Sequence, residues 1–323
     1  MTLAMNRYEQ PLAYLQKVEE KIQAAVACES PEAAESIAHI LGGQGKRLRP
    51  LLVKLSASFG SAALDKVTSV AAAAELIHTA SLVHDDMIDE APYRRGRTTA
   101  HQLWGTQSAV LLGDYLFACA FRLLVDSGQY NGVKWFSAAI ADMCQSEIEQ
   151  ARCLFELEPE EDKYLKRISM KTASLIEACC RSGADLSGLE ERDSLGLVDF
   201  GRHLGLAYQL TDDLLDFLST ATVAGKPVAS DFRRGVVTLP VIYLMEQHPE
   251  RQRIQDMLRQ RAVSDEDWEK VREWVTASGA LARAEKRAQR HIEEACRALA
   301  RLPSVPERSQ MESLCQHLLR RLH

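Results

Sequence analysis

The sequence is poor in residues that interrupt helices and in the features of exported or membrane-bound proteins. It has 17 glycines and 10 prolines among 323 residues, and strand-like alternation is scarce. The N-terminal segment has no apolar core of a signal peptide, and no uncharged apolar run reaches the roughly 18 residues of a membrane span. None of the eight cysteines has the CxxC spacing of zinc sites. We therefore expect a cytoplasmic protein with reduced thiols, no transmembrane segment and no zinc site.

An excess of positive charge is also lacking. Lys and Arg number 39 against 45 Asp and Glu, so the formal net charge is −6. Proteins that bind nucleic acid normally carry a basic surface, so we expect no nucleic-acid partner. A phosphorylated ligand must then be held by local groups of basic side chains.

Helical periodicity, in contrast, runs through the whole chain, of which 46% is apolar. The pattern predicts helices over residues 8–27, 31–42, 50–59, 64–90, 107–126, 133–156, 160–182, 191–220, 238–247, 279–302 and 306–322. Ser264 and Asp267 resemble a capping box and predict one more helix start. Several helices are apolar on more than one face, as in the centre of a large bundle. With no linker and no repeat, we predict an all-α fold and a single domain over residues 1–323.

Two DDxxD motifs lie in apolar stretches far apart in the chain. Their members are Asp85, Asp86, Asp89, Asp212, Asp213 and Asp216. Positions i and i+4 share a helix face, so each motif directs its first and last carboxylates the same way. One such motif alone is more often a solvated helix face, but two in apolar surroundings need cations. Because Mg²⁺ prefers carboxylates, water and substrate phosphates, the motifs predict a diphosphate held by magnesium between two helices.

Three basic groups accompany the aspartates. They are Lys46, Arg47 and Arg49 in GKRLRP, Arg94, Arg95 and Arg97 in RRGR, and Lys171 in SMKTASL. Arginine matches phosphate oxygens with two parallel donors, and lysine supplies a point charge. Each group alone is typical of a solvated surface. Together with the aspartates they predict two diphosphate sites, one held through metal and one held directly.

The pair Gly113–Asp114 interrupts an apolar helix. Either Gly113 allows a close backbone approach, or Asp114 is a hydrogen-bonded carboxylate in the core. We favour the second interpretation.

Five segments resemble the trans-isoprenyl diphosphate synthases, also called polyprenyl synthetases. They are GKRLRP, ELIHTASLVHDDMIDEAPYRRGRTTAH, GDYLFA, KTASL and YQLTDDLLDF, and their order and spacing also match. The resemblance implies an all-α bundle around a central cavity and a homodimer. The implied activity is condensation of isopentenyl diphosphate with an allylic diphosphate such as farnesyl or geranylgeranyl diphosphate. A catalytic subunit that needs a different partner is an open alternative.

The resemblance also implies the roles of the site residues. Asp85, Asp89 and Asp212, with Asp86, Asp213 and Asp216, would be the catalytic groups and would hold roughly two or three Mg²⁺ ions on the allylic diphosphate. The same diphosphate would contact Arg94, Lys171, Thr172, Gln209 and Lys226. Isopentenyl diphosphate would contact Lys46, Arg49, His78 and Arg95. Outside the motif, a histidine such as His78 is more often a satisfied core residue.

The sequence departs from the family pattern after the second aspartate motif. The family often shows GKPxGxDLxEGKxTLP, whereas this chain reads GKPVASDFRRGVVTLP. Ala229 replaces a glycine, Arg234 a common glutamate and Val236 a common lysine. Whether Arg233 or Arg234 compensates for the missing lysine is open.

Product length is indicated by the residues before the first motif, which in this family face the growing chain. Bulky aromatic residues there stop growth early, but Ala80 and Ser81 are small, and Ile77 lies one turn deeper. A helical turn of ~5.4 Å is close to one isoprene unit, so we expect a long all-trans product of roughly C30–C50, with C35–C40 favoured, for quinone side chains. A short C15 or C20 product is the alternative.

Two rival functions are disfavoured. A class I terpenoid cyclase or squalene-type synthase shares the metal motifs, but GKRLRP and RRGR imply a second, metal-free diphosphate site. A regulatory subunit without activity typically lacks some of the aspartates, whereas both motifs are intact here.

Overall fold

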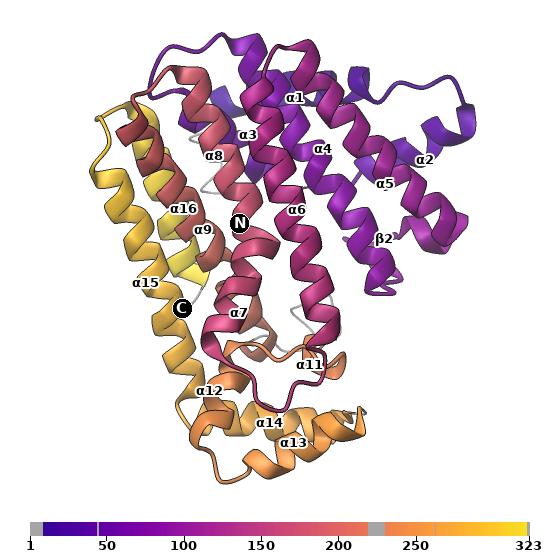
Figure 1. Cartoon of the computed structure of the whole chain (residues 1–323), viewed down its shortest axis with the longest axis vertical. Coiled ribbons are helices and arrows are strands. Elements are labelled where there is room, and N and C mark those ends of the chain that lie inside the picture. The colour runs from indigo at the N-terminus through magenta and orange to yellow at the C-terminus, as the bar shows by residue number, and fades with distance from the viewer. Residues whose placement is uncertain (1–8, 44, 219–229, 262, 322–323) are drawn as a thin grey trace. The chain divides into compact units, whose positions relative to one another are not determined.

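A computed structural model of the chain describes residues 9–43, 45–218, 230–261 and 263–321. Nearly all regular structure in these residues is helical, so the predicted all-α class is confirmed (Figure 1). The strands within them are β1 (Tyr93–Arg94) and β2 (Arg97–Thr98), which form an antiparallel hairpin. The chain divides into two compact units, Met1–Ile140 with Ala178–Leu195, and Ala141–Glu177 with Gly196–His323.

The first unit is built around one long apolar helix. It contains α1 (Glu9–Ala25), α2 (Pro31–Leu41), α3 (Leu48–Ala57), α4 (Leu64–Ile88), α5 (Ala100–Asp126) and the beginning of α6 (Tyr130–Arg152). Ala71, Ala74, Leu76 and Ile77 of α4 are fully buried, and α4 packs along α5, α3 and α1. These small and branched side chains let neighbouring helices approach α4 from several sides.

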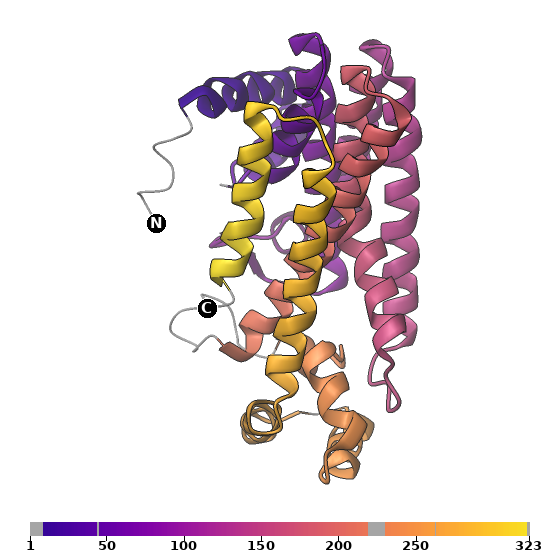
Figure 2. The same ribbon diagram turned by 90° about the vertical axis from the view of Figure 1, so that its left-hand side faces the viewer.

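The second unit collects the later helices. It contains α7 (Glu161–Ile168), a π-helix (Ser169–Ala173), most of α9 (Glu191–Leu218), α11 (Ser230–Arg233), α12 (Leu239–Gln247), α13 (Arg251–Gln260), α14 (Asp265–Ala277), α15 (Ala280–Ala300) and α16 (Pro306–Arg321). The chain passes between the units within α6, α8 (Ser174–Ser187) and α9. Figure 2 shows α15 and α16 side by side and antiparallel. Ala284, Ala288 and Ile292 are among the buried apolar positions along α15.

Two predicted helix starts are confirmed. The Ser30 hydroxyl accepts from the backbone N–H of Ala33 at the start of α2, and Ser264 and Asp267 form the capping box of α14. The start predicted at Pro50 is wrong, because α3 begins at Leu48 after Arg47 adopts a left-handed conformation. The prediction also missed α13, whose sequence is dominated by charged and amide side chains.

Among the described residues, one helix, α5, is long enough and apolar enough to cross a membrane, judged by length and composition alone. The core helix of a soluble protein has the same two properties, and α5 packs along α4. None of the eight cysteines, all of which lie among the described residues, forms a disulfide. Cys144 is exposed, whereas Cys119, Cys179, Cys180 and Cys315 are buried.

Candidate active site

The first aspartate motif forms the last turn of α4. Asp86 is buried, while Asp85 and Asp89 are partly exposed. Arg94 of the hairpin donates its Nε–H to Oδ1 of Asp86 at 2.5 Å. Burial raises the pKa of Asp86 above its ordinary value, although the Arg94 charge opposes this shift. The middle carboxylate therefore ties the hairpin to α4.

Arginines of the hairpin lie against two glycines of the GGQGKR segment. A Cβ on Gly42 would lie 2.8 Å from Nη1 of Arg97, and one on Gly45 would lie 2.8 Å from Nη1 of Arg95. Arg97 also donates to Nδ1 of His39 at 3.0 Å. The structure therefore brings together two basic groups that are far apart in the sequence.

A cleft with an empty volume of about 640 Å³, open solvent included, lies in the first unit. Its lining includes His78, Asp86, Arg47, Arg94, Arg95 and Arg97. Burial lowers the pKa of His78 well below its ordinary value, and the charges of Arg49, Arg95, Arg94 and Arg47 lower it further. A neutral histidine among guanidinium groups is suited to an anionic ligand. Lys46 is exposed and Arg49 partly buried, both outside the lining.

Gly113 allows a close approach of α5 to α4. A Cβ there would lie 2.1 Å from Nε2 of His84, the residue before Asp85. That ring nitrogen lies 3.2 Å from the carbonyl oxygen of Val110. The side chain of Asp114 is 62% exposed, so the favoured interpretation of Asp114 as a core carboxylate is wrong.

The residues predicted to set product length differ in burial along α4. Ala80 and Ile77 are fully buried, whereas Ser81 is partly exposed and donates its hydroxyl to the carbonyl oxygen of His78 at 2.9 Å. Successive helical residues point about 100° apart, which follows from 3.6 residues per turn. A larger side chain at the partly exposed Ser81 should therefore strain the core less than one at Ala80.

The second aspartate motif lies on α9 in the second unit. Asp213 is buried, and Tyr164 donates to its Oδ2 at 2.6 Å while Gln209 donates to its Oδ1 at 2.8 Å. The hydroxyl of Thr172 donates to the amide oxygen of Gln209 at 2.7 Å. Burial, and next the charge of Asp231, raise the pKa of Asp213 to about 7. Both oxygens of this middle carboxylate thus accept hydrogen bonds from the protein, while Asp212 and Asp216 are partly exposed.

The π-helix carries Lys171 and Thr172, where a continuous α-helix was predicted. Isolated π-turns are frequent at functional sites because they redirect side chains. Gly205 of α9 permits the contact with this turn, since a Cβ there would lie 2.5 Å from Cα of Ala173. Lys171 forms an ion pair of 2.5 Å with Glu147, a carboxylate that is largely buried.

The C-terminal end of α16 also reaches the second motif. Arg321 donates to Oδ1 of Asp212 at 2.9 Å. Arg233, one candidate to replace the missing lysine, forms an ion pair with Asp265. Lys226 and Ala229 lie outside the described residues.

The residues that pair with the predicted site residues were not themselves predicted. Glu75, which pairs with Arg47, has the clearest sequence signal, because a lone acid within an apolar helix requires a partner. Tyr164 lies two helical turns before Lys171, which gives a weaker signal. No local pattern indicates Glu147 or Arg321, since their contacts depend on how distant helices pack.

The donor set fits magnesium shared with a substrate. No single place in the described part of the chain has three or more His, Cys, Asp or Glu side chains that could hold a metal. Each motif instead offers two outer carboxylates one turn apart. Magnesium usually takes few protein carboxylates and completes its shell with water and substrate phosphates.

Comparisons with known proteins agree on one class. The polyprenyl synthetase family matches residues 30–275. The chain is 36% identical to solanesyl diphosphate synthase 1, chloroplastic, of Arabidopsis thaliana over 95% of this chain and 77% of that one. It is also 36% identical to heptaprenyl diphosphate synthase component 2 of Geobacillus stearothermophilus over 95% of each. The crystal structure of a decaprenyl diphosphate synthase from Rhodobacter capsulatus has a TM-score of 0.91 at 34% identity, covering 98% of this chain and 99% of that one.

The fold and these relatives define an all-α enzyme that transfers prenyl groups. The chain belongs to the polyprenyl synthetase family. The prediction of a long-chain trans-prenyl diphosphate synthase is confirmed.

Proposed function

We propose that the chain condenses isopentenyl diphosphate with an allylic diphosphate, farnesyl or geranylgeranyl diphosphate, in a magnesium-dependent reaction. The observation that carries this proposal is the cleft beside the first aspartate motif, whose lining includes Arg47, Arg94, Arg95 and Arg97. The product is a long all-trans polyprenyl diphosphate, with C35–C40 favoured at about one isoprene unit per helical turn. Relatives named heptaprenyl, solanesyl and decaprenyl diphosphate synthases support a long product.

In this reaction the allylic carbon–oxygen bond breaks and its electron pair leaves with the diphosphate. The double bond of isopentenyl diphosphate forms the new carbon–carbon bond, and a proton is then lost to the released diphosphate. Bound magnesium supplies positive charge that stabilises the departing diphosphate. The chain holds the two diphosphates and shields the allylic cation from water with apolar side chains.

The residue roles follow from motif and contact. We assign Asp85, Asp89, Asp212 and Asp216 to magnesium, and Asp86 and Asp213 to bracing, because the latter two are buried and bonded to protein donors. The proposed allylic diphosphate contacts are Arg94, Lys171, Thr172, Gln209 and Lys226. The proposed isopentenyl diphosphate contacts are Lys46, Arg49, His78 and Arg95.

Assembly and location form part of the same proposal. The two units together form one domain, the enzyme is cytoplasmic, and it is a homodimer. A heteromer is the second candidate, because two relatives, from Geobacillus stearothermophilus and Bacillus subtilis, are named component 2 of a heptaprenyl diphosphate synthase.

One experiment tests reaction, partner dependence and product length together. The purified chain is incubated with isopentenyl diphosphate, farnesyl diphosphate and Mg²⁺, and the products are separated by chromatography. Products of about C35–C40, the length favoured if one isoprene unit spans about one helical turn, support the proposal. No product from the folded chain alone favours the heteromer, and a product no longer than about C20 contradicts the long-chain assignment.

A further inference from the structure

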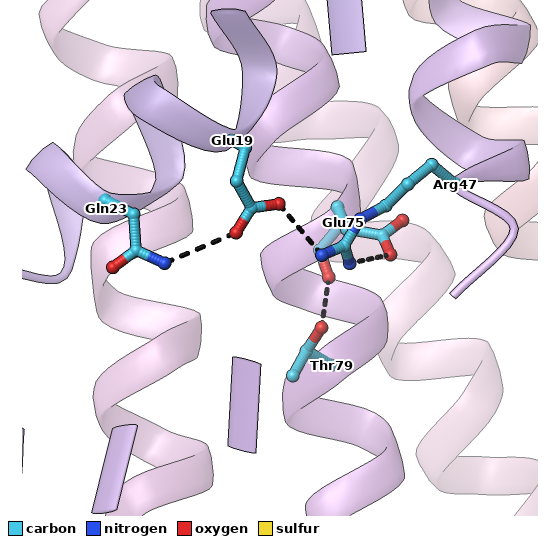
Figure 3. Close-up of polar contacts among 5 residues, drawn as sticks. All are labelled: Glu19, Gln23, Arg47, Glu75 and Thr79. Atoms are coloured by element: carbon cyan, nitrogen blue, oxygen red, sulfur yellow. Dashed lines mark hydrogen bonds and ion pairs between the residues drawn. The ribbon is translucent and has the colours of Figure 1, made fainter. Parts of the chain in front are cut away.

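Two carboxylates engage the guanidinium group of Arg47, which lines the cleft. Nη1 donates to Oε1 of Glu75 at 2.7 Å, and Nη2 donates to Oε2 of Glu19 at 2.8 Å (Figure 3). The other oxygen of Glu19 accepts from Gln23 at 3.3 Å. The three charged side chains come from α1, from the segment before α3 and from α4.

Glu75 is an unexpected group in this place. Its side chain is only 5% exposed, and its partner Arg47 helps to line the arginine-rich cleft. A buried carboxylate is costly unless it is paired, and a negative charge beside a diphosphate site opposes binding. Its pairing with Arg47 resolves both difficulties, because the charge of each offsets the other.

The backbone of Arg47 is held in an uncommon conformation. Its φ of 48° and ψ of 38° are left-handed, and no side chain caps the start of α3 here. Such a conformation persists in a residue other than glycine when the surroundings enforce it. The two ion pairs fix the Arg47 side chain to α1 and α4. Lys46 precedes this residue directly, and Arg49 follows it by two positions, so Arg47 sets the directions from which both side chains leave the backbone.

We propose that Arg47 is a positioning residue, not a diphosphate contact, and that Glu75 and Glu19 hold it so that Lys46 and Arg49 are aimed at isopentenyl diphosphate. The assignment rests on the proposed function. Both terminal nitrogens of Arg47 already donate to carboxylates of the protein, which favours a positioning role over a phosphate contact.

The test compares three conservative variants. Glu75→Gln keeps the shape of the side chain and removes the charge. Arg47→Lys keeps the charge but has no planar fork to serve two carboxylates. Glu19→Gln weakens the more exposed of the two pairs. Gln23→Ala, at an exposed residue beside Glu19, is the matched control.

We measure KM for each substrate, kcat, and metal-free binding of isopentenyl diphosphate by calorimetry. Misplaced contacts reduce productive binding by about 10- to 100-fold. We therefore expect Glu75→Gln and Arg47→Lys to raise KM and Kd for isopentenyl diphosphate by about 10-fold or more, with KM for the allylic substrate unchanged. Glu19→Gln has a smaller effect in the same direction, and Gln23→Ala has none. Because the two groups act as a unit, the double variant Arg47→Gln, Glu75→Gln loses no more than the worse single variant.

A direct phosphate contact gives the opposite result. Glu75→Gln would then free the guanidinium group and leave KM unchanged or lower, and Arg47→Lys would retain most of the binding. That pattern overturns the proposal, as does an equal rise in KM for both substrates. If Glu75→Gln does not fold, Arg47→Lys and Glu19→Gln still decide between the two patterns. An unmodified chain that neither binds nor condenses isopentenyl diphosphate contradicts the proposed function itself.

Discussion

At the scale of single residues, the two aspartate motifs divide their members in the same way. The middle aspartates, Asp86 and Asp213, are buried and accept hydrogen bonds from Arg94 or from Tyr164 and Gln209. The outer aspartates are partly exposed. An i, i+4 pair faces one way on a helix, and the residue after its first member points about 100° away from it. This division supports the proposal that each motif combines two metal ligands with one anchor.

Loss of an outer aspartate should abolish most of the activity. Asp85→Ala or Asp212→Ala is expected to lower kcat at least about 100-fold, the scale of losing transition-state charge stabilisation. Steady-state assays across a range of Mg²⁺ concentrations check this. Near-normal turnover of either folded variant would mean that the motif does not hold the metal.

Variants of the two diphosphate sites should affect the KM values of different substrates. Lys46→Ala and Arg49→Ala are expected to raise KM for isopentenyl diphosphate more than KM for the allylic substrate, and Lys171→Ala should do the reverse. Each loss removes a charge-assisted contact, which is worth about 10-fold or more. Lys171 pairs with Glu147 in the structure, so binding of the allylic diphosphate through Lys171 would require it to leave this partner. Equal changes in both KM values from all three variants contradict this division.

At the scale of elements, sequence periodicity predicted most helices because buried apolar faces recur every three to four residues. The helix predictions failed where the local sequence pattern and the tertiary contacts favour different structures. The segment 160–182 has a helical pattern throughout, but a π-turn interrupts it at Ser169–Ala173 where α9 approaches through Gly205. In α13 only Ile254, Met257 and Leu258 mark the buried face among polar residues. The predicted helices left residues 91–106 without an element, and the β1–β2 hairpin lies in that segment.

A contact between α9 and α15 should make stability depend on pH. Nδ1 of His203 lies 3.0 Å from Nδ1 of His291, so one ring donates and the other accepts. Burial, then the charges of His203 and Arg287, lower the pKa of His291 to about 4. Burial also lowers the pKa of His203, although the carboxylates of Glu294 and Asp199 oppose it. Both rings are therefore neutral in the folded state near pH 7.

A lowered pKa means that the folded state binds fewer protons than the unfolded state once the pH is below the ordinary value of 6.5. Stability should therefore fall by ~1–2 kcal/mol as the pH drops from about 6.5 to about 4, allowing for partial exposure of the rings. Urea unfolding at several pH values measures this loss. His291→Gln should flatten the dependence, and an unchanged slope in that variant would exclude this pair as its source.

At the scale of the whole molecule, the aspartate motifs and basic groups were predictable because short segments carry them. Their neutralising partners were not, since Glu19 meets Arg47, and Arg321 meets Asp212, only after distant helices pack. These ion pairs have a common consequence. Arg47, Arg94 and Lys171 each contact a carboxylate of their own unit, so their positive charges are balanced within the protein before any diphosphate binds. A chain of negative net charge can thus keep strongly basic sites.

Product length tests the enzyme as a whole, because we predict that the growing chain passes the small residues of α4. Ser81→Phe should fill the path one turn before the first motif and shorten the product to about C15–C20, at ~5.4 Å per turn. Metal binding and the first condensation should persist, because the aspartates are untouched. Ser81 is preferred to Ala80, since a ring at the fully buried Ala80 would overpack the core at a cost of ~1–3 kcal/mol.

Product chromatography of the folded Ser81→Phe enzyme, with Ser81→Thr as the control of similar polarity, measures the change. The threonine adds one methyl group and should leave the length near that of the unmodified chain. A phenylalanine enzyme that still makes the full-length product would show that this face of α4 does not line the path. The long-chain assignment would then depend on the relatives alone, because the small side chains before the motif would no longer explain it.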